Sequence, residues 1–260
     1  MTESWSLQGR TALVCGASGG IGEATARLLA ARGARVLAVA RNQEKLQALI
    51  KALPGEGHRF FSVDLSDTDR LQNEIVPLVR NESVQILVNN SGGPKGGLLY
   101  KADINEFTEP LKAHLLASHL LVQAVLPAMQ KASYGRIVNV ISTSVKTPLP
   151  NLGVSNTVRA AMANWSKTLA MELAPFGITV NNVLPGYIET GRLQSLMQTS
   201  ASATGQDVSI VKESWQQSVP MARIGKPLEM AETIAFLASP AASYITGINL
   251  PVDGGRTPSL

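Results

Sequence analysis

The chain has 260 residues, of which 45% are hydrophobic and only 16% are charged, and its formal net charge is +4. This composition excludes a charge-rich disordered chain, and the single cysteine, Cys15, excludes an intramolecular disulfide. Lys and Arg are spread along the whole chain and aromatic residues make up only 5%, so we expect no nucleic-acid partner.

Strand and helix signals alternate through the first half of the chain. The short apolar run Thr11–Cys15 ends in glycines and predicts a buried strand, and the helix that follows, over 21–31, is closed by Gly33. The same signals predict strands at 35–40, 59–63 and 85–88, and helices at 43–52 and from 66 to 80.

The alternation continues in the second half. A long helix is predicted over 105–131, with Pro110 and Pro127 as interruptions near its ends. The polar segment 191–218 is expected to form helical pieces around a mobile loop, and Pro251 favours an edge position or a strand end for the last strand. Further strands are predicted at 136–141, 178–184 and 245–252, and further helices at 155–174 and 228–238.

Continuous apolar strands separated by helices predict a parallel sheet that is covered on both faces. We find no internal repeat and no linker, so the expected fold is one doubly wound, Rossmann-type α/β domain over 1–260. One cysteine and three histidines make a metal site unexpected. No signal-peptide core and no run of about 18 apolar residues is present, so we expect a cytoplasmic protein without a membrane span.

A glycine-rich turn, GASGGIG at 16–22, joins the first strand to the first helix. Glycines allow a tight turn and a close approach to a pyrophosphate, and the helix N-terminus supplies free N–H donors. Glycines that serve only strand-to-helix packing are the alternative. In this strand–turn–helix context the motif favours dinucleotide binding.

Arg41 follows the second strand, where an acidic residue would favour NAD and an arginine favours the 2′-phosphate of NADP. The alternative is that Arg41 is a solvated loop residue. Asp64, after the third strand, either accepts a hydrogen bond from the adenine amino group or caps the next turn. Asn89–Gly93, after the fourth strand, lies at the sheet edge where ligands bind in open α/β folds.

Together these features resemble the short-chain dehydrogenase/reductase family over essentially the whole chain, most closely the branch with 3-oxoacyl-acyl-carrier-protein reductases. The resemblance rests on six segments: CGASGGIG (15–22), VDL (63–65), NNSG (89–92), GRIVNVIS (135–142), ELAPFGITVNNVLPGYIET (172–190) and the tail at 223–255. It implies a cofactor site made of Gly16, Ser18, Gly20, Ile21, Gly22, Arg41, Asp64, Leu65, Asn90, Arg159, Pro185, Gly186 and Ile188.

The family works with an Asn-Ser-Tyr-Lys tetrad, and this chain departs from it at three of four places. Ser142 matches the Ser, but Ser155 stands at the Tyr position, Arg159 at the Lys position and His114 at the Asn position. No Tyr-x-x-x-Lys exists anywhere in the chain. Tyr187 either reaches the site from another side or simply packs. An aliphatic hydroxyl is a far weaker acid than a phenol, so cofactor binding is expected to survive better than catalysis.

The leading hypothesis is an NADP(H)-dependent reductase of a carbonyl, either a 3-oxoacyl thioester or a related ketone. In it Ser142 polarises the carbonyl, Arg159 holds the ribose, and His114 or water carries the proton. His114 is the one group near the site able to titrate near pH 7, unless it is only a satisfied helix-face histidine. The alternatives are an NADP-binding sensor with little turnover, or different chemistry with the same cofactor.

The resemblance also implies a substrate lid at about 191–220 and a homotetramer. The low share of charged residues is compatible with such an assembly, because subunit contacts would bury much of the surface. We expect the helices at 105–131 and 155–174 to form part of these contacts.

Overall fold

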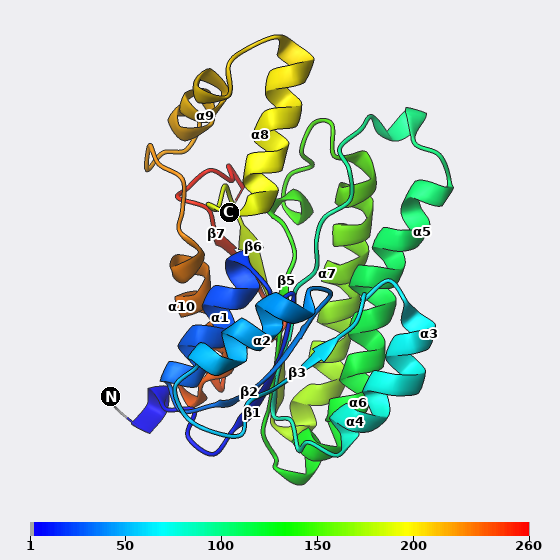
Figure 1. The fold of residues 1–260 in the computed structure, drawn as a ribbon, viewed down its shortest axis with the longest axis vertical. Helices are drawn as coiled ribbons and strands as arrows, with labels where there is room; N and C mark the ends of the chain where they lie inside the picture. Colours follow the sequence, from blue (N-terminus) through cyan, green and yellow to red (C-terminus); the bar gives the residue numbers. More distant parts are fainter. Residues whose placement is uncertain (1–2, 260) are drawn as a thin grey trace.

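Seven parallel strands form one sheet in the order β3-β2-β1-β4-β5-β6-β7 (Figure 1) in a computed structural model that describes residues 3–259. β2 and β3 are added on one side of β1, and β4 to β7 are added on its other side. The order of the strands therefore reverses between β1 and β4, and open α/β folds bind ligands at such a switch point. The strands are β1 Thr11–Cys15, β2 Arg35–Ala40, β3 Arg59–Ser62, β4 Ile86–Asn89, β5 Gly135–Val140, β6 Ile178–Pro185 and β7 Asn249–Val252.

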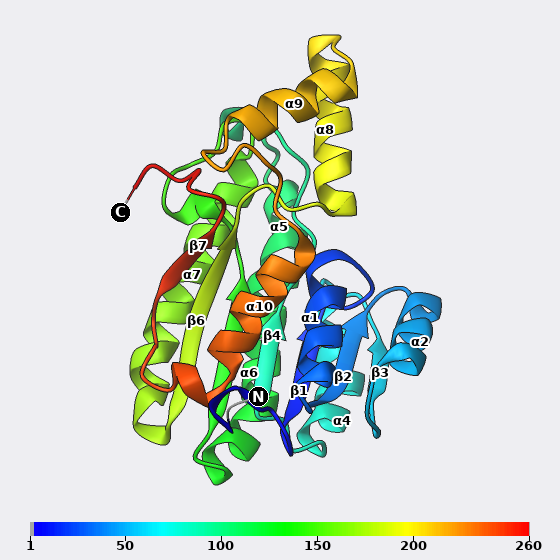
Figure 2. The same cartoon turned by 90° about the vertical axis from the view of Figure 1, so that its left-hand side faces the viewer.

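Helices cover both faces of the sheet, as the doubly wound prediction requires (Figure 2). On one face lie α1 Gly20–Ala31, α2 Gln43–Ala52 and α10 Pro227–Ala238. On the other face lie α3 Thr68–Arg70, α4 Val76–Arg80, α6 Ala117–Lys131 and α7 Gly153–Leu173. α8 Gly191–Thr204 and α9 Val208–Gln217 stand beyond the carboxyl ends of the strands (Figure 1).

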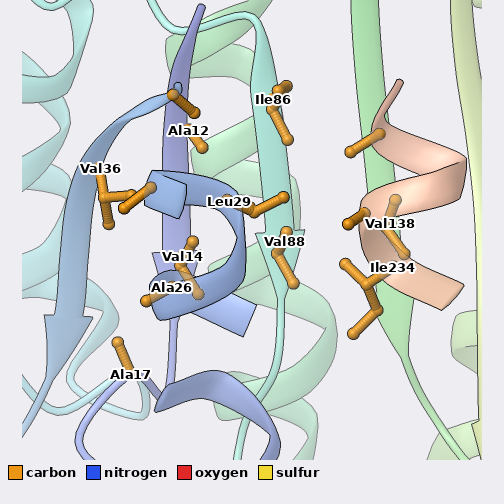
Figure 3. Close-up of a cluster of buried hydrophobic side chains, with 14 of the residues drawn as sticks. Ala12, Val14, Ala17, Ala26, Leu29, Val36, Ile86, Val88, Val138 and Ile234 are labelled. Carbon is orange, nitrogen blue, oxygen red and sulfur yellow. The ribbon is translucent and has the colours of Figure 1, made fainter. Parts of the chain in front are cut away.

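The core divides into two layers because successive strand residues point to opposite faces. In β1, Val14 belongs to the cluster under α1 and α10, whereas Leu13 belongs to the cluster under α6. Figure 3 shows Leu29 of α1 and Ile234 of α10 packed against the first of these layers. Both layers are built from fully buried aliphatic residues, and they hold the strand ends at one edge in fixed positions.

The long helix predicted over 105–131 is interrupted, but not at its prolines. α5 Asn105–Leu111 and α6 are joined by a π-helical turn, Lys112–Leu116, and Pro110 and Pro127 lie inside the helices. The wide turn begins two residues after Pro110, whose nitrogen has no hydrogen to donate to the preceding turn. This turn carries His114, which is buried.

Two further expectations need correction at the level of elements. The last strand begins at Asn249 rather than at 245, because Gly247 has φ +74° and the preceding residues form a turn. The predicted helix from 66 to 80 contains a π-helical turn, Leu71–Ile75, between α3 and α4. The edge position predicted from Pro251 is confirmed, since β7 pairs only with β6 in the sheet.

One helical segment of residues 3–259, Asn105–Lys131, is long and apolar enough to cross a membrane by length and composition. Core helices of soluble proteins pass the same test, and Leu121, Val125 and Met129 of this segment pack against the sheet.

Candidate functional site

The glycine turn packs so tightly that two of its glycines cannot carry a side chain. A Cβ on Gly22 would lie 2.2 Å from the carbonyl oxygen of Gly16, and one on Gly16 would lie 2.5 Å from Asn90 Nδ2. Around Gly19, in contrast, a Cβ would meet nothing within 4 Å. The turn is therefore closed towards the protein and open on the side from which a ligand would approach.

The N-terminus of α1 opens into this space without a side-chain cap. Its free N–H groups and positive dipole end suit a phosphate group. Ser18 and Gly20 are half-buried beside it, and Ile21 packs against the core. The turn thus fits the pyrophosphate of a dinucleotide, as the sequence predicts.

The segment after β6 lies against the same turn. A Cβ on Gly20 would come within 3.0 Å of Thr190 Cγ2, and a Cβ on Gly186 would lie 2.6 Å from Asp253 Cα. Pro185 ends β6, and Ile188 is buried and forms a bridge with Gly225. The predicted residues 185–188 therefore belong to the same end of the sheet as the glycine turn.

Arg41 and Asp64 meet at the ends of β2 and β3. The Arg41 side chain is 78% exposed, and its Nη1 donates to Asp64 Oδ2 over 3.5 Å. Asp64 Oδ1 accepts hydrogen bonds from the backbone N–H and the hydroxyl of Ser66, at 3.0 and 2.8 Å. Burial alone would raise the pKa of Asp64, but these bonds and the Arg41 charge hold it below the usual value. The turn-capping alternative for Asp64 is thus observed, and the guanidinium of Arg41 remains accessible.

Arg159 and His114 line one small cavity beneath the carboxyl ends of β1 and β4. The cavity measures about 10 Å³, the size that holds a single water molecule. Asn90 and Leu65 also line it. Arg159 Nη1 donates to the carbonyl of Val140 over 3.0 Å. Three buried atoms around the cavity have no partner in the protein: Arg159 Nε, His114 Nε2 and Asn89 Oδ1.

The environment of His114 removes its ability to titrate near pH 7. Burial and the charge of Arg159 hold the pKa of His114 well below its usual value, although a hydrogen bond with the backbone of Gly92 acts in the opposite direction. Its Nδ1 is hydrogen-bonded to Ser91 Oγ. Burial and the Arg159 charge therefore favour the neutral imidazole and argue against a His114 that titrates near neutrality in the folded protein.

Ser142 and Ser155 do not line this cavity. Ser142 follows β5 two residues after its end, and its Oγ accepts a hydrogen bond from Ser144 N over 3.0 Å. Ser155 lies on α7 four residues before Arg159, hence on the same helix face, and is half-buried. Within residues 3–259 no hydrogen bond joins the two serines. The structure thus brings Arg159 and His114 to one cavity, and the two serines are not hydrogen-bonded to each other.

A row of buried asparagines, which the sequence analysis missed, ends at this cavity. Asn89 Nδ2 donates to Asn139 Oδ1 (2.8 Å), Asn139 Nδ2 donates to Asn182 Oδ1 (3.0 Å), and Asn182 Nδ2 donates to Asn249 Oδ1 (2.8 Å). The four residues are register partners on β4, β5, β6 and β7. The free acceptor of this row, Asn89 Oδ1, belongs to the cavity that Arg159 lines. An asparagine in each of four strands, three of them buried, was the available signal.

Tyr187 packs rather than reaching the cavity. Its ring stacks on Trp215 of α9 with centroids 4.7 Å apart, and its hydroxyl accepts a hydrogen bond from Arg256 Nη2 over 2.9 Å. α8 and α9 also share a small apolar cluster with Tyr187. Among residues 3–259 no group of three or more His, Cys, Asp or Glu side chains is placed to hold a metal ion.

Comparison with known proteins decides the family. Residues 16–257 match the family model described as enoyl-(acyl carrier protein) reductase. The chain belongs to the short-chain dehydrogenase/reductase family. The 3-oxoacyl-acyl-carrier-protein reductase of Vibrio cholerae is 37% identical over 254 residues, which is 96% of this chain and 98% of that protein.

Two solved structures of the family are similar in fold. The L-sorbose reductase of Gluconobacter frateurii, solved with NADPH and L-sorbose, has a TM-score of 0.92 and 28% identity, with 99% of this chain and 100% of that chain covered. A 3-oxoacyl reductase of Agrobacterium tumefaciens C58, solved with NADP, has a TM-score of 0.85 and 28% identity, with coverage of 98% and 97%. Both are solved with the phosphorylated nicotinamide cofactor.

Proposed function

We propose that this short-chain dehydrogenase/reductase uses NADP(H) to reduce a carbonyl group, in a 3-oxoacyl thioester or a related ketone. The observation that carries the proposal is the cofactor cradle. The glycine turn is closed towards the protein and open on the other side. Arg41 stands at the end of β2, where no acidic residue follows the strand, and its side chain is 78% exposed despite the long contact to Asp64. The NADP(H) complexes of the two similar structures support this choice of cofactor.

Three residues of the altered tetrad, Ser142, Arg159 and His114, receive a role in this proposal. Ser142 polarises the substrate carbonyl with its hydroxyl, and Arg159 donates hydrogen bonds to the nicotinamide ribose. The cofactor supplies the hydride when bound. Neutral His114 has no imidazolium proton to give, so the proton comes from water, and His114 and Asn89 orient it in the cavity that Arg159 lines.

The altered tetrad also favours a second candidate, an NADP-binding protein with little turnover. Ser155 provides no phenol, and His114 is neutral, so no group of ordinary acidity stands at the acid position. Loss of a general acid costs about 10²–10⁴ in rate, whereas the cofactor cradle is unaffected by it. The segment 191–220, which is α8, α9 and their connections, is proposed as the substrate lid in either case.

A single-turnover experiment separates the two functions. The protein is loaded with one equivalent of NADPH and mixed with a panel of 3-oxoacyl thioesters and ketones, and the absorbance of bound NADPH is followed. We expect oxidation with at least one carbonyl compound, at the same rate in an Arg70→Met variant on the distant helix α3. Bound NADPH that stays reduced across the panel would contradict the reductase and support the binding protein.

A further inference from the structure

A second arginine reaches the mouth of the site from α8. Arg192 is the second residue of that helix, and its Nη2 donates to the backbone carbonyl of Pro94 over 2.5 Å. Its guanidinium also lies 3.5–3.8 Å from the place where a Cβ on Gly93 would be. Arg192 therefore bridges the segment after β6 and the loop after β4.

The positive charge at this opening has no counter-charge. In the described part of the chain neither Arg192 nor Arg159 forms a salt bridge, whereas Arg35 and Arg223 are each paired with a carboxylate. Burial, and after it the charge of Arg192, lower the pKa of Arg159 to about 10, so the two guanidinium groups act on each other. Arg159 is 7% exposed and its Nε has no partner. The two guanidinium groups thus add positive charge to the same region of the site, and neither is paired with a carboxylate among residues 3–259.

From this arrangement we propose that Arg192 binds the carboxylate of an acidic carbonyl substrate, with Arg159 adding to the attraction. The inference rests on the proposed reductase function and narrows its substrate class to oxo-acids. A guanidinium has five N–H donors, and the bond to Pro94 uses one, which leaves a fork that matches a carboxylate. The cofactor pyrophosphate is the other anion near the cleft, but the N-terminus of α1 and the open side of Gly19 already suit it.

The test compares acetoacetate with its uncharged methyl ester in the presence of NADPH. The wild type is expected to prefer the acid. Arg192→Met should lower kcat/KM for acetoacetate about 10- to 100-fold, because a charge-assisted hydrogen bond is lost, and should leave the ester almost unaffected. Arg192→Lys should retain part of the preference, since it keeps the charge but loses the fork. Arg70→Met, an exposed arginine of α3, serves as the control.

Binding measurements keep the inference separate from catalysis. Calorimetry with the NADP⁺-loaded protein gives the Kd of acetoacetate even if turnover is absent, and the same loss in Arg192→Met is expected there. If the protein does not turn over but still binds acetoacetate more tightly than the ester, the result contradicts the reductase function and leaves the carboxylate subsite supported. If the wild type has the same kcat/KM and Kd for the acid and the ester, or binds neither of them, the inference is overturned. A weaker NADPH Kd in Arg192→Met, with equal losses for both substrates, overturns it as well and assigns Arg192 to the cofactor phosphates.

Discussion

Arg41 tests the choice of cofactor at the scale of a single residue. Its side chain is held only by the long contact to Asp64, so its removal leaves the folded protein almost unchanged. We expect Arg41→Ala to weaken NADPH binding about 10- to 100-fold and to leave NADH binding unchanged, because only NADPH carries the 2′-phosphate. Fluorescence titration with both cofactors is the measurement. Tighter binding of NADH than of NADPH by the wild type would disprove the NADP assignment.

The depressed pKa of His114 predicts a pH-dependent stability. In the unfolded chain a histidine protonates near pH 6.5, whereas folded His114 stays neutral well below that pH. As the pH falls below about 6.5, the unfolded state takes up a proton that the folded state does not, so the free energy of unfolding decreases by up to about 1.4 kcal/mol per pH unit. His114→Gln should remove this contribution.

Urea unfolding of the wild type and of His114→Gln between about pH 7 and pH 5 measures the effect, since other groups contribute equally to both proteins. As the pH falls, the wild type should lose more stability than His114→Gln. Parallel curves would mean that His114 has an ordinary pKa in the folded state.

The altered tetrad predicts a gain of activity on restoration. Ser155→Tyr with Arg159→Lys supplies a phenol and a neighbouring ammonium, and we expect turnover of simple ketones to rise by up to about 10²–10⁴. Ser155→Tyr alone should achieve less, because Arg does not reproduce the hydrogen-bond geometry of Lys. His114→Asn is added in a triple variant. NADPH consumption is the measurement.

Two results would contradict this account of the tetrad. Fast wild-type reduction that Ser155→Ala abolishes would identify Ser155 as a working catalytic group. A triple variant that binds NADPH but stays inactive would place the defect in the substrate pocket.

The sequence predicted Arg159 and His114 as neighbours, because the resemblance fixes their places on two helices. The sequence did not predict that burial and the Arg159 charge lower the pKa of His114. The burial of this residue depends on the π-helical turn that carries it. Arg192 also escaped prediction. Its sequence neighbours give no sign that the side chain crosses to Pro94, 98 residues away along the chain.

At the scale of elements, the asparagine row ties four strands together through their side chains. Replacing Asn139 by Leu leaves the amide of Asn89 and the carbonyl of Asn182 without partners in the core, so we expect a loss of about 2–5 kcal/mol of stability. Asn249→Ala is the matched control. It should cost less, because Asn249 is only half-buried at the end of the row. Denaturant unfolding measures both, and equal losses would argue against a cooperative row.

The elements themselves were largely predictable. Strands such as 11–15 and 35–40 are confirmed to the residue, because buried parallel strands are continuous apolar runs bounded by turn residues. The late start of β7 was not predictable, because it depends on hydrogen bonds to β6, which is distant in sequence. The π-helical turns have local hydrogen bonds, but no residue pattern in the sequence distinguishes them from the α-helix around them. Strand order likewise follows from tertiary packing rather than from any local pattern.

At the scale of the whole molecule, exposed apolar side chains favour self-association. Leu116 at the start of α6, Met171 in α7 and Phe176 just after it are 48%, 64% and 45% exposed. We expect a homotetramer that buries such residues of the two predicted interface helices. Light scattering should give four times the chain mass, and Met171→Glu should shift the assembly to smaller species. A particle of 27.6 kDa at micromolar concentration would contradict the prediction.

The stack of Tyr187 on Trp215 gives the molecule an intrinsic optical probe. Trp215 belongs to α9, whereas Tyr187 lies two residues after the end of β6 and Arg256 belongs to the C-terminal segment. Any displacement of α9 separates the indole from the tyrosine ring and from the nearby guanidinium, and therefore changes the emission of Trp215. With Trp5 and Trp165 replaced by Phe, the remaining fluorescence would follow ligand entry in real time without an attached dye.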